Sequence, residues 1–364
     1  MQKFDYLIVG AGLFGITFAR LASDSGKSCL IIDKRDHIGG NCYTKKIENI
    51  NVHCYGAHIF HTSNRFVWDF VNKFTTFNNF INSPKAVSKG KLYSLPFNMN
   101  TFYELWGTKS PKNAQHIIEN QRFTGTPKNL EEQALSLVGS DIYYTLIKEY
   151  TEKQWGRSAK DLPPFIIKRL PLRFTYNNNY FNDVYQGIPE DGYTSMFDKM
   201  LSGIEVRLNT NYFNDREYFN SLAHKIVYTG CIDEFFNYEF GKLEYRSLRF
   251  ENKIIDTDNY QGNAVINYCD KNINYTRIIE HKHFEKSNSQ KTVITKEYPQ
   301  EHTINTVPYY PINDSKNQDI FKKYKEKSKT LTDFIFGGRL SEYKYMDMHV
   351  VIESAFNKFK ITTK

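Results

Sequence analysis

The feature that most constrains the fold is a glycine-rich turn near the start of the chain. An apolar run, residues 6–9, leads into it, and a helical pattern follows. The three glycines of the turn form G-x-G-x-x-G: Gly10, Gly12 and Gly15. A second apolar run, residues 29–32, ends in the acidic Asp33. This order predicts a β-α-β unit that binds a dinucleotide, with the pyrophosphate at the helix N-terminus and Asp33 accepting hydrogen bonds from a ribose. An ordinary glycine turn of an α/β protein is the alternative.

A second glycine pair follows at once, in the segment DKRDHIGGN, and bears on which dinucleotide is bound. A nicotinamide-binding unit does not need Gly39 and Gly40. The pair resembles the longer flavoprotein signature, in which such glycines bring the backbone close to the FAD pyrophosphate. We therefore expect FAD rather than NAD as the cofactor. A plain hairpin turn at this pair is the alternative.

Length and composition exclude several classes of protein. The chain has 364 residues, of which 40% are hydrophobic, enough for two or three domains. Its net charge of +8 fits either a lysine-rich solvated surface or the attraction of anionic ligands such as pyrophosphates. The sequence has no basic block, zinc spacing or aromatic RNA motif, so no nucleic-acid partner is expected. It has no apolar run near the ~18 residues of a membrane span, so no membrane insertion is expected. Five cysteines without a C-x-x-C pair favour a reducing, cytoplasmic location.

The pattern along the chain predicts an α/β fold: a discontinuous Rossmann-like FAD-binding domain with an inserted helical domain and a β-sheet domain. Alternation at period two marks strands between residues 226 and 300. A late strand, DFIFGG, and a closing helix from about Met348 are typical of segments that return to the first domain, where the helix N-terminus would face the flavin. An ordinary amphipathic terminal helix is the alternative. The approximate boundaries are 1–80, 190–240 and 325–364 for the FAD-binding domain, 81–185 for the helical domain with a mobile substrate loop, and 241–324 for the β-sheet domain.

Three helices of the middle region have clear end signals. Asn100 is expected to cap the first of them. Ser110 followed by Pro111 marks the start of the second. Asn129 marks the start of the third, which is expected to end at Gly139.

The segment 150–193 has the greatest concentration of aromatic and basic side chains. Trp155 precedes a glycine and two prolines, an arrangement typical of a loop that moves over a nucleotide ligand. Arg169 and Arg173 lie four residues apart, and an arginine fork matches phosphate oxygens. Core packing of Trp155 and a surface salt bridge of Arg169 are the alternatives.

Two histidine pairs could suggest a metal site, which we do not favour. His281 and His283 lie beside Glu280, but no third ligand has a suitable spacing. His58 and His61 are three residues apart, so on an extended strand one would face a cofactor and the other the core. The usual nucleophile, Walker and zinc motifs are absent from the sequence, so a cofactor must supply the chemistry.

Longer strings in the chain resemble the bacterial UDP-galactopyranose mutases from residue 4 to the last helix. They include YGAHIFHT, YTEKQWGRS, IIKRLP, YTRIIEHKHF and FGGRLSEYKYMDMH. The resemblance implies a flavoenzyme that interconverts UDP-galactopyranose and UDP-galactofuranose, with N5 of reduced FAD attacking the sugar anomeric carbon. It also implies a homodimer whose product supplies galactofuranose for cell-surface polysaccharide such as lipopolysaccharide.

The resemblance further implies roles for single residues. Arg169 and Arg277 would clamp the substrate diphosphate, and His61 would lie over the isoalloxazine; these three are the catalytic candidates. The other substrate-binding residues would be Tyr150, Trp155, Tyr180, Asn267, Glu297, Tyr310, Tyr345 and His58. The cofactor-binding residues, besides His61, would be Gly10, Gly12, Leu13, Phe14, Gly15, Asp33, Lys34, Gly40, Asn41, Arg339, Asp347 and Met348. No residue is assigned to a metal.

Within the substrate set, the implied roles differ. Tyr150 would stack on uracil, and Trp155 would lie on the mobile loop. Asn267 and Glu297 would line the sugar site, and three tyrosines would bind the phosphates: Tyr180, Tyr310 and Tyr345. His58 favours plain galactose over an N-acetylated sugar.

Two other functions stay open at this stage. An FAD-dependent oxidoreductase of the amine-oxidase type would share the first domain but would have no diphosphate for an arginine pair to bind. A nucleotide-sugar-binding protein with an inert flavin would keep the binding residues without turnover.

Overall fold

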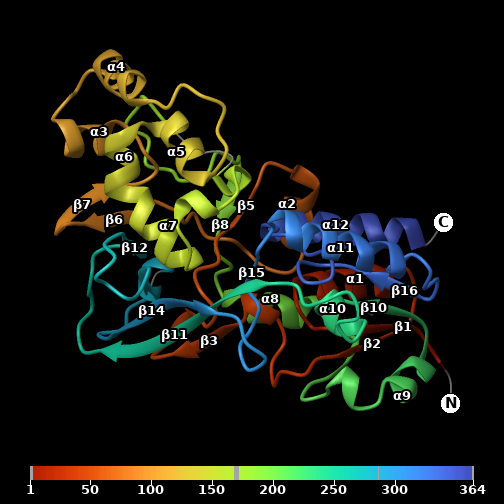
Figure 1. Cartoon of the computed structure of the whole chain (residues 1–364). Coiled ribbons are helices and arrows are strands. Elements are labelled where there is room, and N and C mark those ends of the chain that lie inside the picture. Colours follow the sequence, from red (N-terminus) through yellow and green to blue (C-terminus); the bar gives the residue numbers. More distant parts are fainter. Residues whose placement is uncertain (1–2, 168–171, 286, 363–364) are drawn as a thin grey trace.

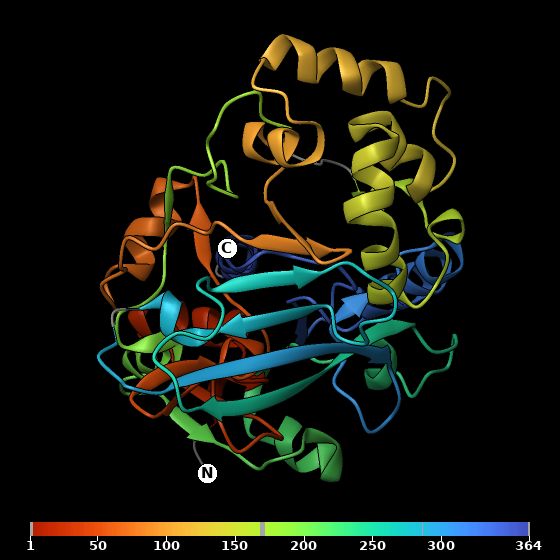
Figure 2. The same ribbon diagram turned by 90° about the vertical axis from the view of Figure 1, so that its left-hand side faces the viewer.

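The computed structural model describes residues 3–167, 172–285 and 287–362. Figure 1 shows a parallel sheet and the helices that cover it; this part of the molecule carries both chain ends. A second sheet lies beside it, and a lobe of helices stands above that second sheet. The turned view of Figure 2 shows the strands of the second sheet side by side under this lobe.

The first sheet has five parallel strands in the order β16-β10-β1-β2-β9 within the described residues. It places β1 next to β2, as the β-α-β pattern predicts, and α1 connects the two. The elements are β1 (Phe4–Val9), α1 (Leu13–Asp24), β2 (Cys29–Ile32), β9 (Glu205–Arg207), β10 (Ala223–Tyr228) and β16 (Phe334–Phe336). The predicted fold class is confirmed, because strands from three distant stretches of the chain form one Rossmann-like sheet.

Alternation along the strands explains how both faces of this sheet are buried. Ile8 and Ile31 point into a core shared with α1, whereas Leu7 and Leu30 point into a core on the other face. A parallel sheet covered on both faces needs such apolar runs. The closing helix α12 (Met348–Thr362) packs along α1, with the rings of Phe18 and Phe359 5.4 Å apart.

The second sheet has seven strands in the order β15-β11-β14-β13-β12-β6-β7 within the described residues, antiparallel except where β12 meets β6. Its edge hairpin, β6 and β7, lies inside the range 81–185 expected for the helical domain; Figure 2 shows it in orange above the blue-green strands. The strands are β6 (Lys85–Ser88), β7 (Lys91–Ser94), β11 (Tyr245–Ile255), β12 (Val265–Tyr268), β13 (Arg277–Glu280), β14 (Thr292–Glu301) and β15 (Tyr310–Pro311).

The helical lobe has its own apolar core, centred on Phe102, Leu130 and Tyr143. A π-helical stretch, Tyr143–Ile147, runs directly into α7, which descends from the lobe toward the second sheet (Figure 1). The helices are α3 (Met99–Trp106), α4 (Pro111–Gln121), α5 (Leu130–Val138), α6 (Ser140–Ile142) and α7 (Lys148–Trp155).

The predicted helix starts are confirmed in two of three cases. Ser110 caps α4 with Pro111 as its first residue, and Asn129 caps α5, which ends at Gly139. The prediction for Asn100 is wrong, because the capping side chain of α3 is that of Asn98. Asn98 forms a reciprocal capping box with Thr101, which starts the helix one residue before Asn100.

The remaining elements connect these parts. They are β3 (Thr44–Ile47), β4 (Ile50–His53), β5 (Phe60–Thr62), α2 (Arg65–Val71), β8 (Tyr185–Gly187), α8 (Gly192–Met200), α9 (Arg216–Ser221), α10 (Ile232–Phe235) and α11 (Ser315–Ser328), with short 3-10 turns at Gly40–Cys42, Ala159–Asp161, Pro164–Ile167, Tyr212–Asn214 and His281–Phe284. Within the described ranges, no helix combines the length and the apolar character that crossing a membrane requires.

Candidate functional site

The glycine turn between β1 and α1 is tightly enclosed at two of its glycines and open at the third. A Cβ on Gly10, whose φ is +114°, would lie 2.0 Å from Thr229 Oγ1, and one on Gly15 would lie 2.1 Å from the Gly10 oxygen. A Cβ on Gly12 would meet no described atom closer than the Gly40 Cα at 4.0 Å. The turn is therefore closed toward the protein and accessible to a ligand at Gly12.

The second glycine pair packs against this turn. The Gly39 N–H donates to the Ala11 oxygen over 2.7 Å, and a Cβ on Gly40 would lie 3.0 Å from the Gly12 Cα. Both glycines have positive φ, and the chain continues into the 3-10 turn Gly40–Cys42 rather than into a hairpin. Gly12 and Gly40 thus bring two stretches of backbone together, as a pyrophosphate site requires.

The N-terminus of α1 and the residues around Asp33 complete this part of the site. Gly12 is the N-cap, and among the described residues no side chain caps the helix, which leaves N–H groups and the positive end of the dipole for an anion. Leu13 and Phe14 are buried in its first turn, and Lys34 is exposed.

The Asp33 carboxylate already has partners within the protein. It accepts from the Ala11 N–H over 2.7 Å and from the Arg35 N–H over 2.8 Å. Asp33 therefore also orders the glycine turn, and its expected contact with a ribose stays a prediction.

Arg35 is a candidate that the sequence reasoning missed. Its Nη2 donates to Asn41 Oδ1 over 3.0 Å, and its Nη1 is buried without a partner among the described residues. Nothing in the segment DKRDH distinguishes this arginine from an exposed one, because the ring over which its Cζ lies at 4.8 Å, that of Tyr55, belongs to a later segment.

The stretch after β16 returns to the glycine turn. A Cβ on Gly337 would lie 2.1 Å from the Phe14 ring, so this stretch touches the first turn of α1. Further along, Arg339 donates from Nε to the Met346 oxygen over 2.7 Å. Asp347 precedes α12, and Met348 is the buried first residue of that helix.

His61 lies on β5 in a fixed orientation. Its Nδ1 is 2.6 Å from Asp183 Oδ2, and its ring stacks on Phe181 at 3.7 Å. Burial opposes ionisation of Asp183, but hydrogen bonds from His61 and Ser63 outweigh it and lower the pKa of the carboxyl group. Asp183 is 122 positions away in sequence, so no local signal could have linked it to His61.

The expectation that His58 and His61 share an extended strand is wrong, because β5 begins at Phe60. His58 lies in the preceding loop, with Nδ1 2.8 Å from the Gly56 oxygen. Burial and the nearby Arg339 guanidinium lower the pKa of His58 to about 4, so its ring is neutral near pH 7.

Three candidate substrate residues form one row across the second sheet. Asn267 on β12, Arg277 on β13 and Glu297 on β14 are register partners, so their side chains share a face. Asn267 Oδ1 and Arg277 Nε are buried without a hydrogen-bond partner among the described residues. The Nε is 3.3 Å from Glu297 Oε1, an ion pair without hydrogen-bond geometry.

Aromatic residues surround this row. Arg277 Nη2 donates to the Tyr150 hydroxyl over 2.8 Å. The ring of Tyr310 is 6.4 Å from that of Trp155, at the end of α7, and 6.0 Å from that of Tyr345. Tyr345 in turn lies under Arg339, whose Cζ is 4.7 Å from the ring centre, so the series leads from the substrate candidates to the stretch beside the glycine turn.

The electrostatics of the row keep Arg277 charged beside the Glu297 carboxylate. Burial opposes the charge of Arg277, but Glu297 and Tyr150 raise the pKa of the guanidinium above its ordinary value, so it stays a cation. Burial raises the pKa of Tyr150, which keeps its hydroxyl protonated. With Glu297 on its Nε side, the Arg277 guanidinium can offer its other N–H groups to phosphate oxygens.

The remaining candidates have separate surroundings. Arg169 lies outside the described residues. Arg173 holds the loop that carries Tyr180, since its Nη2 contacts Asn182 and the oxygens of Tyr180 and Phe181. Tyr180 itself is 39% exposed.

The side chains of His281 and His283 make contacts within the protein. His281 lies in the core between the His53 N–H and Thr295 Oγ1, and His283 pairs with Glu280 at 3.1 Å. Among the described side chains, no three His, Cys, Asp or Glu residues gather as metal ligands would.

The fold and the site together define an α/β protein with a dinucleotide-binding domain and an adjoining anion site. A family model described as UDP-galactopyranose mutase matches residues 145–345, and one described as an NAD(P)-binding Rossmann-like domain matches residues 8–74. The chain belongs to the UDP-galactopyranose mutase family. It is therefore an isomerase of the mutase type, and its cofactor is a flavin.

Individual relatives agree over nearly the whole chain. A dTDP-fucopyranose mutase of Escherichia coli is 43% identical over 360 residues, 96% of each chain. A probable UDP-galactopyranose mutase of Klebsiella pneumoniae is 40% identical over 363 residues, 98% of this chain and 94% of that protein. A crystal structure of reduced UDP-galactopyranose mutase superposes with a TM-score of 0.75 at 11% identity, over 99% of this chain and 95% of that one, and so supports the fold.

Proposed function

We propose that the protein interconverts UDP-galactopyranose and UDP-galactofuranose with the help of reduced FAD. The observation that carries the proposal is the half-buried Arg277 guanidinium, whose Nε makes an ion pair but no hydrogen bond with Glu297 and whose Nη2 donates to Tyr150. Such a group fits the diphosphate of a sugar nucleotide, and family membership supplies the reaction class.

The residues around the glycine turn fit an FAD. Gly12 is open to a ligand, α1 has no side-chain cap among the described residues, and Arg35 Nη1 is unpartnered. The cofactor set would be Gly10, Gly12, Leu13, Phe14, Gly15, Asp33, Lys34, Gly40, Asn41, His61, Arg339, Asp347 and Met348. When bound and reduced, FAD supplies an electron-rich N5 that can act as a nucleophile toward the sugar anomeric carbon.

Arg277, together with Arg169, would stabilise the departing diphosphate. Negative charge grows on the diphosphate as its bond to the sugar breaks, and a guanidinium placed beforehand stabilises that charge without reorganising. The hydroxyls of Tyr180, Tyr310 and Tyr345 would donate to the other phosphate oxygens.

The other candidates would orient the sugar, the base and the flavin. Asn267 has a free Oδ1 that can accept from a sugar hydroxyl, with Glu297 beside it. Tyr150 would stack on uracil, and Trp155 would close the nucleotide side. Asp183 holds His61 by its Nδ1, which leaves Nε2 to meet the flavin.

The test is turnover of UDP-galactofuranose by the dithionite-reduced, FAD-loaded protein, with products separated by chromatography. We expect the pyranose to form only after reduction, with no net flavin oxidation; a reduced protein without turnover would contradict the proposal. Net reduction of oxidised flavin by a substrate would instead indicate an oxidoreductase.

Arg277→Ala should keep its flavin and lose turnover by more than about 100-fold, because a charge-stabilising guanidinium is removed. Arg249→Ala is the matched control, since Arg249 is an exposed arginine of the same sheet that stacks on Tyr298. Undiminished turnover by Arg277→Ala would show that the clamp assignment is wrong.

A second substrate is favoured by one specific observation: the 43% identical relative is a dTDP-fucopyranose mutase. Fucose is a 6-deoxygalactose, and dTDP differs from UDP by a base methyl group and a missing ribose hydroxyl. The same diphosphate clamp serves both substrates, so the two sugar nucleotides should be assayed side by side. A kcat/KM at least tenfold higher for the dTDP sugar would show that it, and not the UDP sugar, is the preferred substrate.

We also propose the setting of the enzyme. Five unpaired cysteines support a cytoplasmic location. A homodimer, the three-domain boundaries given above, the preference of His58 for plain galactose and the supply of galactofuranose for surface polysaccharide follow from the family resemblance. Light scattering tests the homodimer, and turnover of an N-acetylated substrate tests the preference of His58.

A further inference from the structure

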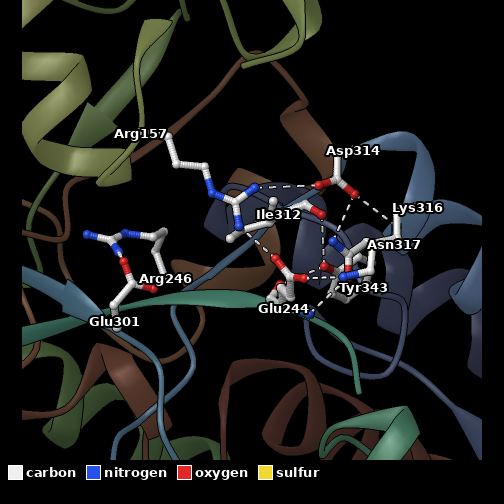
Figure 3. A network of polar contacts seen from close by, with 9 residues as sticks. All are labelled: Arg157, Glu244, Arg246, Glu301, Ile312, Asp314, Lys316, Asn317 and Tyr343. Atoms are coloured by element: carbon white, nitrogen blue, oxygen red, sulfur yellow. Dashed lines mark hydrogen bonds and ion pairs between the residues drawn. The ribbon is translucent and has the colours of Figure 1, made fainter. Parts of the chain in front are cut away.

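The end of α7 crosses from the helical lobe to the rest of the molecule, and two arginines hold it there (Figure 3). Trp155 is the last residue of α7, and Gly156 follows in the left-handed conformation with a φ of 66°. Arg157 comes next, outside the helix. The position of Trp155 therefore depends on what holds residues 154–157.

Arg246, on β11, supports this end from below. Its side chain is 4% exposed, and its Nε donates to the Gln154 oxygen over 3.1 Å while Nη1 pairs with Glu301. A Cβ on Gly156 would lie 2.8 Å from that Nη1, so the helix end rests directly on the guanidinium.

Arg157 ties the same end to a second place. Its Nη2 pairs with Glu244 Oε2 at 2.7 Å, and its Nη1 lies 3.7 Å from Asp314 Oδ2 (Figure 3). Asp314 caps α11 through the Asn317 N–H. The other oxygen of the Glu244 carboxylate accepts from Lys316 Nζ at 2.7 Å.

Glu244, which accepts from Arg157, is itself fixed by hydrogen bonds to its main chain. The Asn317 side chain accepts from the Glu244 main-chain N–H over 3.0 Å, and the Tyr343 hydroxyl donates to the Glu244 main-chain oxygen over 2.6 Å. Tyr343 is buried and stands two residues before Tyr345, whose ring continues the series from Trp155 and Tyr310. The pair between Arg157 and Glu244 therefore connects the lobe side of the site to the cofactor side.

We propose that Arg157 is a positioning residue: its pair with Glu244 sets Trp155 and the rest of α7 at the distance from Tyr310 and Arg277 that nucleotide binding needs. The inference rests on the proposed function. The side chains of Arg157 and Glu244 are 39% and 33% exposed, and ion pairs with that exposure add little to stability. Loss of the Arg157–Glu244 pair should therefore weaken ligand binding and leave the stability of the fold nearly unchanged.

The experiment measures UDP binding by calorimetry to the FAD-loaded protein, together with KM and kcat. Arg157→Gln should weaken UDP binding and raise KM about two- to fivefold, with kcat, flavin content and melting temperature near those of the wild type. Arg157→Lys, which keeps the charge, should recover part of the loss. Glu244→Gln should match Arg157→Gln, and the double variant should be no worse than either.

Lys316→Gln is the matched control. It removes an equally short contact from the same carboxylate but none from α7, so UDP binding should not change. Wild-type affinity in Arg157→Gln, or an equal loss in Lys316→Gln, would overturn the proposal. A wild-type protein that binds UDP without turnover would contradict the proposed function alone, since UDP binding by the variants would still decide the role of Arg157. A wild-type protein that does not bind UDP would contradict the proposed function and the role of Arg157.

Discussion

Glycines of the G-x-G-x-x-G turn are required for different physical reasons, although they belong to one motif. Gly15 permits contact between α1 and the turn before it, because its missing Cβ would lie 2.1 Å from the Gly10 oxygen. Gly12 has extended backbone, with a φ of −82°, and no atom of the described residues would lie closer than 4.0 Å to a Cβ added there. The fold therefore requires glycine at position 15, whereas only a ligand would require it at position 12.

This difference leads to a prediction for the two alanine variants. Gly12→Ala should fold normally and bind FAD roughly tenfold more weakly, because the new methyl group occupies the approach of the pyrophosphate. Gly15→Ala should lose about 1–3 kcal/mol of stability, since the backbone must move apart. Flavin absorbance after gel filtration and the urea midpoint of each variant measure these effects. Normal FAD affinity in Gly12→Ala would place the pyrophosphate elsewhere.

At the scale of elements, the ends of helices depend on side chains that the local sequence describes only in part. Ser110 and Asn129 cap α4 and α5 as expected. In α3 two asparagines two positions apart both suit a cap, and the choice falls on Asn98. Asn98 is fully buried, and its Nδ2 also donates to the Asn177 oxygen and to Asn178 Oδ1. Those partners are about 80 positions away, so the local pattern could not favour Asn98.

We predict different costs for removing these two side chains. Asn98→Ala should lower the free energy of unfolding by about 1–3 kcal/mol, because it removes a cap and leaves buried polar groups without partners. Asn100→Ala should cost less than about 1 kcal/mol, since among the described residues its side chain donates to Asn178 alone. Urea unfolding of both variants checks the comparison. An equal or larger cost for Asn100→Ala would contradict the capping assignment.

At the scale of the whole molecule, buried histidines join the small β3–β4 hairpin to the seven-stranded sheet. The His53 N–H donates to His281 Nδ1, and the two rings lie 5.7 Å apart. Burial lowers the pKa of His281 to about 3, and burial with the nearby histidines lowers the pKa of His53 well below its ordinary value. Both rings are therefore neutral in the folded protein at pH values where they are charged in the unfolded chain.

The sign of the pH dependence follows from these pKa values. Below about pH 6.5 the unfolded chain protonates His281, whereas the folded protein does not until about pH 3. Stability should therefore fall as the pH falls through this window, by up to about 1.4 kcal/mol per pH unit for each such histidine. His281→Gln should have a shallower slope between pH 6.5 and 4.5 than the wild type. His224→Gln, an exposed site on β10, is the control, and an unchanged slope in His281→Gln would contradict the argument.

The candidate site was predictable to the extent that its residues have local partners or family motifs. The glycine turn, the second glycine pair, α1 and β2 follow from contiguous sequence, and the structure places them together. Asp183 and Arg35 were missed because their contacts with His61 and Tyr55 depend on chain segments brought together by folding. The roles of Arg277, Tyr150 and the other substrate residues stay predictions, although these side chains lie close together.

The sequence by itself determined the dinucleotide unit, the alternation of the strands and the family, because each depends on short-range periodicity or on motif order. Only the tertiary structure decided that Asn267, Arg277 and Glu297 stand in one row and that Arg157 reaches Glu244. The reason is physical: strand register and the docking of α7 are set by packing between segments far apart in the chain. No local propensity specifies contacts of that range.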